Sequence, residues 1–368
     1  MALSGYFLTD LIKIDGSLLE GGGSIVRNTI ALSTIFQKPV EIFNIRAKRS
    51  KPGLRNQHTF VIKSIGEICN AEMTGVNLGS SQVTFYPGKI NGGEYKIDVQ
   101  TAGSLTLMLQ ALIPVAAYAP NPTKLLLKGG TDVPMAPPLD YIRFVYLPML
   151  ERLGLDITLC QGRRGHYPRG GGTLSCDVNP IIRLQPIMYK FEEPFKIERI
   201  NAKAHAVQLP SHIVDRMITS AEEELKKHDY TLENIERDCP EPKYDTHVGP
   251  GTGIILWAYT NYGTILAGDG LGEKGLPAEE VGKIAAKRLL EQIATQKPID
   301  YHLADQLILW MSLSDFPSII DTTKITLHTI TNIEIVKKFT GAEFIVDGQE
   351  GKPGTISCEP TTIQNHQK

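Results

Sequence analysis

The chain has 368 residues, of which 42% are hydrophobic and 21% charged, and its formal net charge is −2. This composition is ordinary for a folded globular protein. It excludes a disordered chain, a coiled coil, a fibrous repeat and a strongly basic protein that coats nucleic acid. At roughly 100–200 residues per domain, the length predicts two or three domains.

The N-terminal segment lacks a long apolar stretch behind a basic flank, which argues against a signal peptide. The longest apolar run, 105–119, contains Gln110 and is too short to cross a bilayer, so it predicts a buried helix. The five cysteines are scattered and form no CxxC pair, which argues against a zinc ribbon or a secreted disulfide scaffold. We therefore expect a cytoplasmic protein without a membrane span.

A weak internal repeat organises the chain: a Gly-Ser pair opens an apolar helix, and a proline then opens a second helix. These openings stand at Gly23 and Pro52 and again at Gly103 and Pro138, and a third pair of helices follows at 304–313 and 328–339. The third pair comes about 100 residues later than the first two predict, which indicates an inserted domain.

We predict an α/β (α+β) fold in which a large domain, 1–182 and 281–368, contains three repeated βαβαββ units. A smaller α/β domain, 183–280, is predicted to be inserted before the third unit. The amphipathic helix at 277–293 is interpreted as the return to the large domain.

The EGGGS segment at 20–24 lies between a strand-like start and a helix. Its glycines let backbone N–H groups approach an anion at a helix N-terminus, with Glu20 placed to meet a cation and Arg27 on the first turns. A tight turn with a solvated Glu20 is the competing interpretation.

Two basic segments without acidic residues, 42–66 and 161–172, also suggest phosphate. Either segment alone fits a solvated basic loop, but together they favour a polyphosphate or a nucleic-acid backbone. The cations of the second segment are Arg163, Arg164, His166 and Arg169.

The other motifs in the sequence say less about function. The GLGEKG segment at 270–275 matches GxGxxG but is interpreted as a turn, because no second parallel strand follows it. P-loop, GxSxG and HExxH motifs do not occur. His205 and His212 are seven residues apart with no third ligand in the sequence around them, so metal binding there is judged improbable.

Six segments, in this order along the chain, resemble the motif series of RNA 3′-terminal-phosphate cyclases. They are DGSLLEGGGSIVR (15–27), IRAKRSKPGLRNQH (45–58), GGTDVPMAPPLDYI (129–142), RGHYPRGGG (164–172), HLADQL (302–307) and HTITNIEIV (328–336). The resemblance covers nearly the whole chain. It implies the fold predicted above and a soluble ligase of RNA processing that uses ATP and Mg²⁺ or Mn²⁺.

The resemblance also implies the reaction: an RNA 3′-phosphate becomes a 2′,3′-cyclic phosphate, and AMP and pyrophosphate are released. His328, in the H-x-x-T-N motif, matches the family's nucleophile, which carries AMP covalently before AMP moves to the RNA phosphate. A neutral imidazole is a good nucleophile near pH 7, so this role is chemically reasonable.

Further roles follow from the resemblance alone. Glu20 is expected to bind the metal. The residues expected at the ATP site are Arg27, Gln110, Pro137, Tyr141, His302, Leu303, Ala304, Asp305 and Gln306. Those expected to hold RNA or its phosphates are Arg46, Arg49, Arg55, Gln57, His58 and Arg169. The partner is then an RNA with a 3′-phosphate end, and the oligomeric state stays open, a homo-oligomer included.

Two other functions fit part of this sequence. A non-catalytic, cyclase-like RNA-binding protein of ribosome biogenesis would not need the set of His328, Glu20, Arg27 and HLADQ that this chain contains. An enolpyruvyl-transferase-like enzyme would share the repeat unit, but the RGHYPRGGG loop is unlike it.

Overall fold

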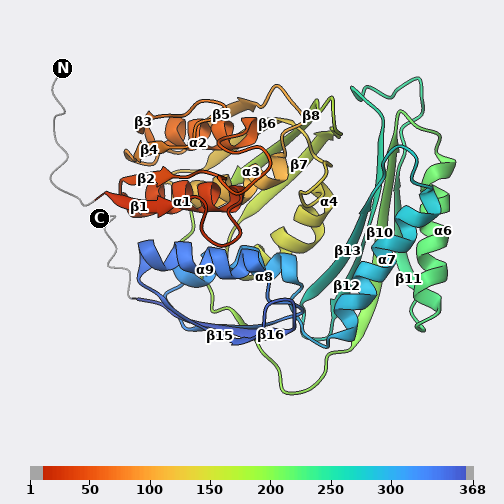
Figure 1. Ribbon diagram of the computed structural model, residues 1–368. Helices are drawn as coiled ribbons and strands as arrows, with labels where there is room; N and C mark the ends of the chain where they lie inside the picture. Colours follow the sequence, from red (N-terminus) through yellow and green to blue (C-terminus); the bar gives the residue numbers. More distant parts are fainter. Residues whose placement is uncertain (1–10, 362–368) are drawn as a thin grey trace.

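A computed structural model describes residues 11–361 and shows a mixed α/β protein with four four-stranded sheets (Figure 1). The predicted fold class is confirmed. No helix in this described part is long and apolar enough to cross a membrane.

The first sheet comes from residues 12–86 and has the strand order β1-β2-β4-β3. Its elements are β1 (Ile12–Asp15), α1 (Gly23–Phe36), β2 (Val40–Phe43), α2 (Asn56–Cys69), β3 (Glu72–Thr74) and β4 (Val83–Tyr86). Strands β1 and β2 are parallel, so the chain must cross over between them, and α1 is that crossover. The remaining pairs are antiparallel.

The second sheet repeats this topology with the order β5-β6-β8-β7. Its elements are β5 (Gly93–Asp98), α3 (Leu105–Ala117), β6 (Thr123–Gly129), α4 (Leu139–Tyr141), the π-helical turn η1 (Ile142–Tyr146), α5 (Leu147–Arg152), β7 (Ile157–Arg163) and β8 (Gly172–Val178). Helix α3 is the buried helix predicted from the apolar run. Ser104 caps it, because the Ser104 hydroxyl accepts a hydrogen bond from the Leu107 N–H at 3.1 Å.

The third sheet has the order β15-β16-β14-β9, again with one parallel pair, β9 and β14. Its elements are β9 (Met188–Tyr189), α8 (Tyr301–Leu313), β14 (Ser318–Thr322), α9 (Leu327–Thr340), β15 (Glu343–Gly348) and β16 (Gly354–Glu359). The inserted segment follows β9, so it lies between the first strand of this sheet and the others. The predicted insertion point, before the whole third unit, is therefore slightly too early.

The inserted segment forms the fourth sheet, β11-β10-β12-β13, with two helices on its outer face (Figure 1). Its elements are β10 (Ile197–Val207), α6 (His212–Lys226), β11 (Leu232–Asp238), β12 (Gly251–Thr260), β13 (Ile265–Leu271) and α7 (Ala278–Ala294). Its core draws on residues from Phe195 to Ile293. Helix α7 therefore packs in this second core, through Val281, Ala285 and Leu289, and is not a return to the large domain.

Strand β12 contributes side chains to the cores of both domains, because successive side chains point to opposite faces of the sheet. Ile254, Leu256 and Ala258 face the core beneath α6 and α7, while Ile255 and Trp257 belong to the large core. The Trp257 ring stacks on Phe144 of η1 with ring centroids 4.3 Å apart. The inner face of the inserted sheet is thus covered by the large domain.

Candidate active site

Glu20 lies in the loop between β1 and α1, in the segment that the sequence pointed to. Leu19 and Gly21 both have positive φ, 45° and 60°, and Gly22 leaves room for the Glu20 carboxylate, which would collide with a Cβ there. The carboxylate pairs with Arg49 and accepts a hydrogen bond from the Ser24 hydroxyl at 3.2 Å. The Glu20 side chain is only 8% exposed.

His328 lies beside this carboxylate. It occupies the first turn of α9, and its Nδ1 is 3.7 Å from Glu20 Oε2. The Glu20 N–H also donates to Thr331 Oγ1, one turn further along α9, at 3.3 Å. The motif pair Glu20 and His328, which are 308 residues apart in the chain, is therefore brought together as expected.

The start of α9 is fixed from α8. Thr326 caps α9 and accepts a hydrogen bond from the Thr329 N–H at 2.9 Å, and the Thr326 and Thr329 hydroxyls both donate to Asp305 Oδ1. Asn332 donates to the Asp305 carbonyl at 2.9 Å and accepts from Asn28 of α1 at 2.8 Å. Asp305 therefore acts, in this structure, as the anchor that positions His328.

Electrostatics keep the His328 imidazole neutral at pH 7. Burial lowers its pKa below the ordinary 6.5; Asp305 opposes this shift, and the nearby cations Arg27 and Arg49 add to it. Burial raises the pKa of Asp305 to about 6. A neutral imidazole is the form that can attack phosphorus.

Arg27 and His58 lie next to each other over the start of α1. A Cβ on Gly23 would come within 2.2 Å of His58 Nε2 and 3.2 Å of an Arg27 guanidinium nitrogen. No acceptor among residues 11–361 pairs with Arg27, and burial lowers its pKa to about 10, so it stays charged. Burial, with Arg27, Arg46 and Arg55, lowers the pKa of His58 to about 3. An unpaired cation at a helix N-terminus is a ready site for a phosphate.

The other predicted RNA contacts surround this point. The Arg46 side chain folds back onto its own loop and donates to the carbonyls of Lys51 and Gly53. Arg55 is the N-cap residue of α2, and its N–H donates to His58 Nδ1 at 3.0 Å. Gln57 lies near Gly103, so the starts of α1, α2 and α3 meet.

The residues predicted for the adenine site come from α3, from α8 and from the segment that includes α4. Asp300 caps this helix and accepts a hydrogen bond from the Tyr141 hydroxyl at 2.8 Å, which holds the Tyr141 ring edge-on to His302, with ring centroids 6.0 Å apart. His302 is exposed. The Pro137 carbonyl accepts a hydrogen bond from the Thr106 hydroxyl at 2.8 Å. Thr106 lies on α3, one turn before Gln110, which is half-buried. Tyr141 and His302 are therefore in ring contact, and Pro137 is tied to the start of α3.

Leu303 and Ala304 are fully buried, so their side chains pack within the large core. Gln306 donates to the His302 carbonyl at 3.0 Å, and its own oxygen is buried with no hydrogen-bond partner in the described part of the chain.

The second basic segment is not a free phosphate-binding loop, and this expectation is wrong for Arg164 and His166. Both are buried, and Arg164 is paired with Asp132, Asp140 and Asp238. These acids come from distant parts of the chain, so the local absence of acids was misleading. Arg169 donates to the Val248 carbonyl of the inserted domain at 2.9 Å, and none of its contacts lies at His328.

Sequence reasoning missed the groups that hold the site together: Ser24, Asn28, Asp300, Thr326 and Thr329. Two of them had a signal, because Asp300 and Thr326 each directly precede a helical run, where capping residues are preferred. The pairing of Asn28 with Asn332 had none.

Comparison with known proteins decides the family. The family model described as RNA 3′-terminal phosphate cyclase matches residues 18–346. The chain belongs to the RNA 3′-terminal phosphate cyclase family. It is 42% identical to the RNA 3′-terminal phosphate cyclase of Ignicoccus hospitalis, over 93% of this chain and 97% of the relative. It is 44% identical to that of Hyperthermus butylicus (92% and 95%) and 43% identical to that of Pyrococcus furiosus (94% and 98%). The family and the enzyme class predicted from the motifs are confirmed.

Proposed function

We propose that this protein uses ATP to convert an RNA 3′-terminal phosphate into a 2′,3′-cyclic phosphate through a covalent His328–AMP intermediate. The proposal rests mainly on one observation: the neutral His328 imidazole, on the first turn of α9, lies 3.7 Å from the Glu20 carboxylate. Glu20 directly precedes the start of α1, where Arg27 has no partner among residues 11–361.

The chemistry consists of three displacements at phosphorus. First, a His328 ring nitrogen attacks the α-phosphorus of ATP; an N–P bond forms, the α–β bridging P–O bond breaks and pyrophosphate leaves. An oxygen of the RNA 3′-phosphate then attacks the same phosphorus, and the N–P bond breaks to leave an RNA–phosphate–AMP anhydride. Finally the ribose 2′-OH, losing its proton, attacks the RNA phosphorus, and AMP leaves as the cyclic phosphate closes.

The residues of this chain supply position and charge. Since Glu20 faces Nδ1, Nε2 is the ring nitrogen left to attack, and Asp305 fixes the backbone from which the ring projects. Arg27, at the α1 N-terminus, would neutralise phosphate oxygens as negative charge builds up. His302, Tyr141 and Pro137 would hold the adenine, and the loop of Arg46, Arg49 and Arg55 would hold the RNA end.

Glu20 fits a Mg²⁺ or Mn²⁺ ion, because such ions are held by one or two carboxylates together with substrate phosphates. When bound, the ion would neutralise charge on those phosphates. Arg49 now pairs with the Glu20 carboxylate and would give up part of that contact.

The test is incubation with α-labelled ATP and Mg²⁺, followed by denaturing electrophoresis, and a second incubation with an RNA that ends in a 3′-phosphate. We expect an acid-labile protein–AMP adduct and an RNA end that becomes resistant to phosphatase. Folded protein that binds this RNA and forms neither product would favour the non-catalytic, cyclase-like RNA-binding alternative.

Replacing Glu20 by Gln keeps the shape of the side chain and removes its charge. We expect half-maximal adenylylation to need at least about 10–100-fold more Mg²⁺. A Mg²⁺ titration measures this, with Glu67→Gln, an exposed position on α2, as the matched control. An unchanged Mg²⁺ requirement in Glu20→Gln would show that Glu20 does not bind the metal.

The lowered pKa of His328 predicts its pH dependence. Because the ring protonates only below its ordinary 6.5, the nucleophile stays available as the pH falls through 6.5 and is lost at lower pH. Arg27→Met removes a cation that lowers this pKa, so the titration should move toward higher pH. NMR titration of the His328 ring in the free protein measures both shifts, and a His328 that titrates at or above 6.5 would contradict the prediction.

A further inference from the structure

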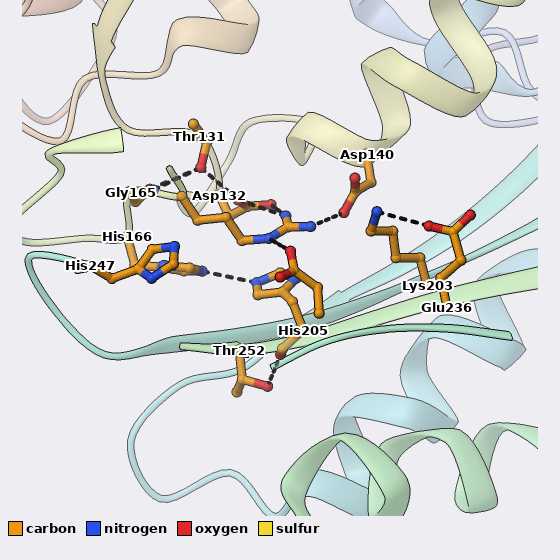
Figure 2. A network of polar contacts seen from close by, with 12 residues as sticks. Thr131, Asp132, Asp140, Gly165, His166, Lys203, His205, Glu236, His247 and Thr252 are labelled. Atoms are coloured by element: carbon orange, nitrogen blue, oxygen red, sulfur yellow. Dashed lines mark hydrogen bonds and ion pairs between the residues drawn. The ribbon is translucent and has the colours of Figure 1, made fainter. Parts of the chain in front are cut away.

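A second cluster of chemically active side chains lies away from His328, where the inserted domain meets the large domain. His166 follows β7, His205 is on β10, and Asp132 follows β6 (Figure 2). All three are buried, with exposures of 6%, 3% and 1%. The mechanism proposed above uses none of them.

The three side chains converge on one point. The Nε2 atoms of His166 and His205 face each other at 3.0 Å, and one ligand atom from each of the three residues lies within 4.8 Å of the others. Two imidazole nitrogens bound to one tetrahedral zinc ion at ~2.0–2.1 Å would stand about 3.3 Å apart. The observed pair is close to that separation.

The backbone of β12 is shaped to admit the rings. A Cβ on Gly251 would lie 2.0 Å from the His166 ring, and one on Gly253 would lie 3.0 Å from His205. Glycine at these two positions lets both imidazoles lie close to the strand backbone.

The surroundings carry an excess of carboxylates. Asp132, Asp140 and Asp238 surround the single guanidinium of Arg164. Asp132, Asp140 and His205 line a cavity of about 20 Å³, enough for one water molecule or ion, and Asp140 Oδ1 is buried with no hydrogen-bond partner among residues 11–361. A divalent cation with a bound water would offset that negative charge and offer a donor to Asp140.

The Asp132 side chain is held in place for such a role. Its carboxylate accepts a hydrogen bond from the Thr131 hydroxyl at 2.7 Å and is paired with Arg164. Hydrogen bonds of this kind orient metal ligands.

We propose that Asp132, His166 and His205 form a zinc site, with water as the fourth ligand, that ties the inserted domain to the large domain. Imidazole nitrogen with one carboxylate is a donor set that suits Zn²⁺ better than Mg²⁺. The site is separate from Glu20, and its role is structural.

The test is metal binding by the whole protein without ATP or RNA, so its result does not depend on the cyclase reaction. Chelator-stripped protein is reloaded with Zn²⁺ and analysed by mass spectrometry for metal content, and Co²⁺ is used as a spectroscopic probe of tetrahedral coordination. We expect about one Zn²⁺ per chain and the intense visible absorption of tetrahedral Co²⁺. His205→Gln and His166→Gln should each lose the ion, with an affinity loss larger than about 10–100-fold.

His212→Gln is the matched control, because His212 is exposed on the same domain and should retain the metal. Gly251→Ala is a second variant that keeps all three ligands but displaces the His166 ring, so it should also weaken binding. The proposal is overturned if the wild-type protein takes up no Zn²⁺, or if both histidine variants bind as much Zn²⁺ as the wild type does. The cluster would then be a hydrogen-bonded histidine pair beside a water-sized cavity.

Discussion

The His328→Ala variant is expected to form no covalent AMP adduct, a loss of at least about 10⁴-fold in adenylylation, while its fold stays intact. The reason is that no other side chain can replace the attacking nitrogen, and removing a nucleophile costs nearly the whole covalent step. The adduct formed with α-labelled ATP is the measurement. The circular dichroism spectrum and melting temperature report on the fold.

Two companion variants sharpen this result. His328→Asn keeps a polar side chain on the first turn of α9 and should be equally inactive. His212→Ala removes an exposed histidine elsewhere and should adenylylate normally. If His328→Ala still forms the adduct, the nucleophile is another residue, and the roles proposed for Glu20 and Asp305 around it fall as well.

The Arg164→Met variant should show the largest loss of stability. Arg164 is buried and reaches Asp238 at 2.8 Å, Asp140 at 2.7 Å and Asp132 at 3.2 Å. Its removal leaves the buried carboxylates of Asp132 and Asp140, and the half-buried one of Asp238, without their cation, which costs about 3–5 kcal/mol of the free energy of unfolding. Urea denaturation measures this as a lower midpoint.

Arg216→Met serves as the control for that experiment. Arg216 also pairs with a carboxylate, Glu279 at 2.7 Å, but both groups face the solvent, so no measurable loss is expected. If Arg164→Met is no less stable than Arg216→Met, the three acids are not held by Arg164 in solution. Neutralising Asp132 and Asp140 as asparagines in the Arg164→Met background should recover part of the stability.

Local sequence patterns explain why part of the candidate site could be predicted. The glycines that follow Glu20 and the helix that carries His328 are short-range features, whose signal lies within a few neighbouring residues. The six motif segments also occur along the chain in the order typical of one family, which made the family recognisable. The meeting of α1 and α9 at Glu20, by contrast, depends on contacts between residues about 300 positions apart in the chain.

The inserted domain shows the limit of this reasoning. The apolar stripe of α7 was visible, but a stripe does not say which sheet it covers, and the helix was assigned to the wrong core. For β12, only the assembled molecule shows that both faces are buried, one under α6 and α7 and the other against Phe144.

By itself, the sequence determined the fold class and the family, and it proposed His328 as the nucleophile, since these depend on residue types at fixed local spacing. The tertiary structure alone decided which charges meet. Arg164 and His166 lie in a segment without acids, so they were expected to hold phosphate. Folding instead places Arg164 among Asp132, Asp140 and Asp238, and His166 against His205. Electrostatic pairing acts through space over a few ångströms, and spacing along the chain does not record it.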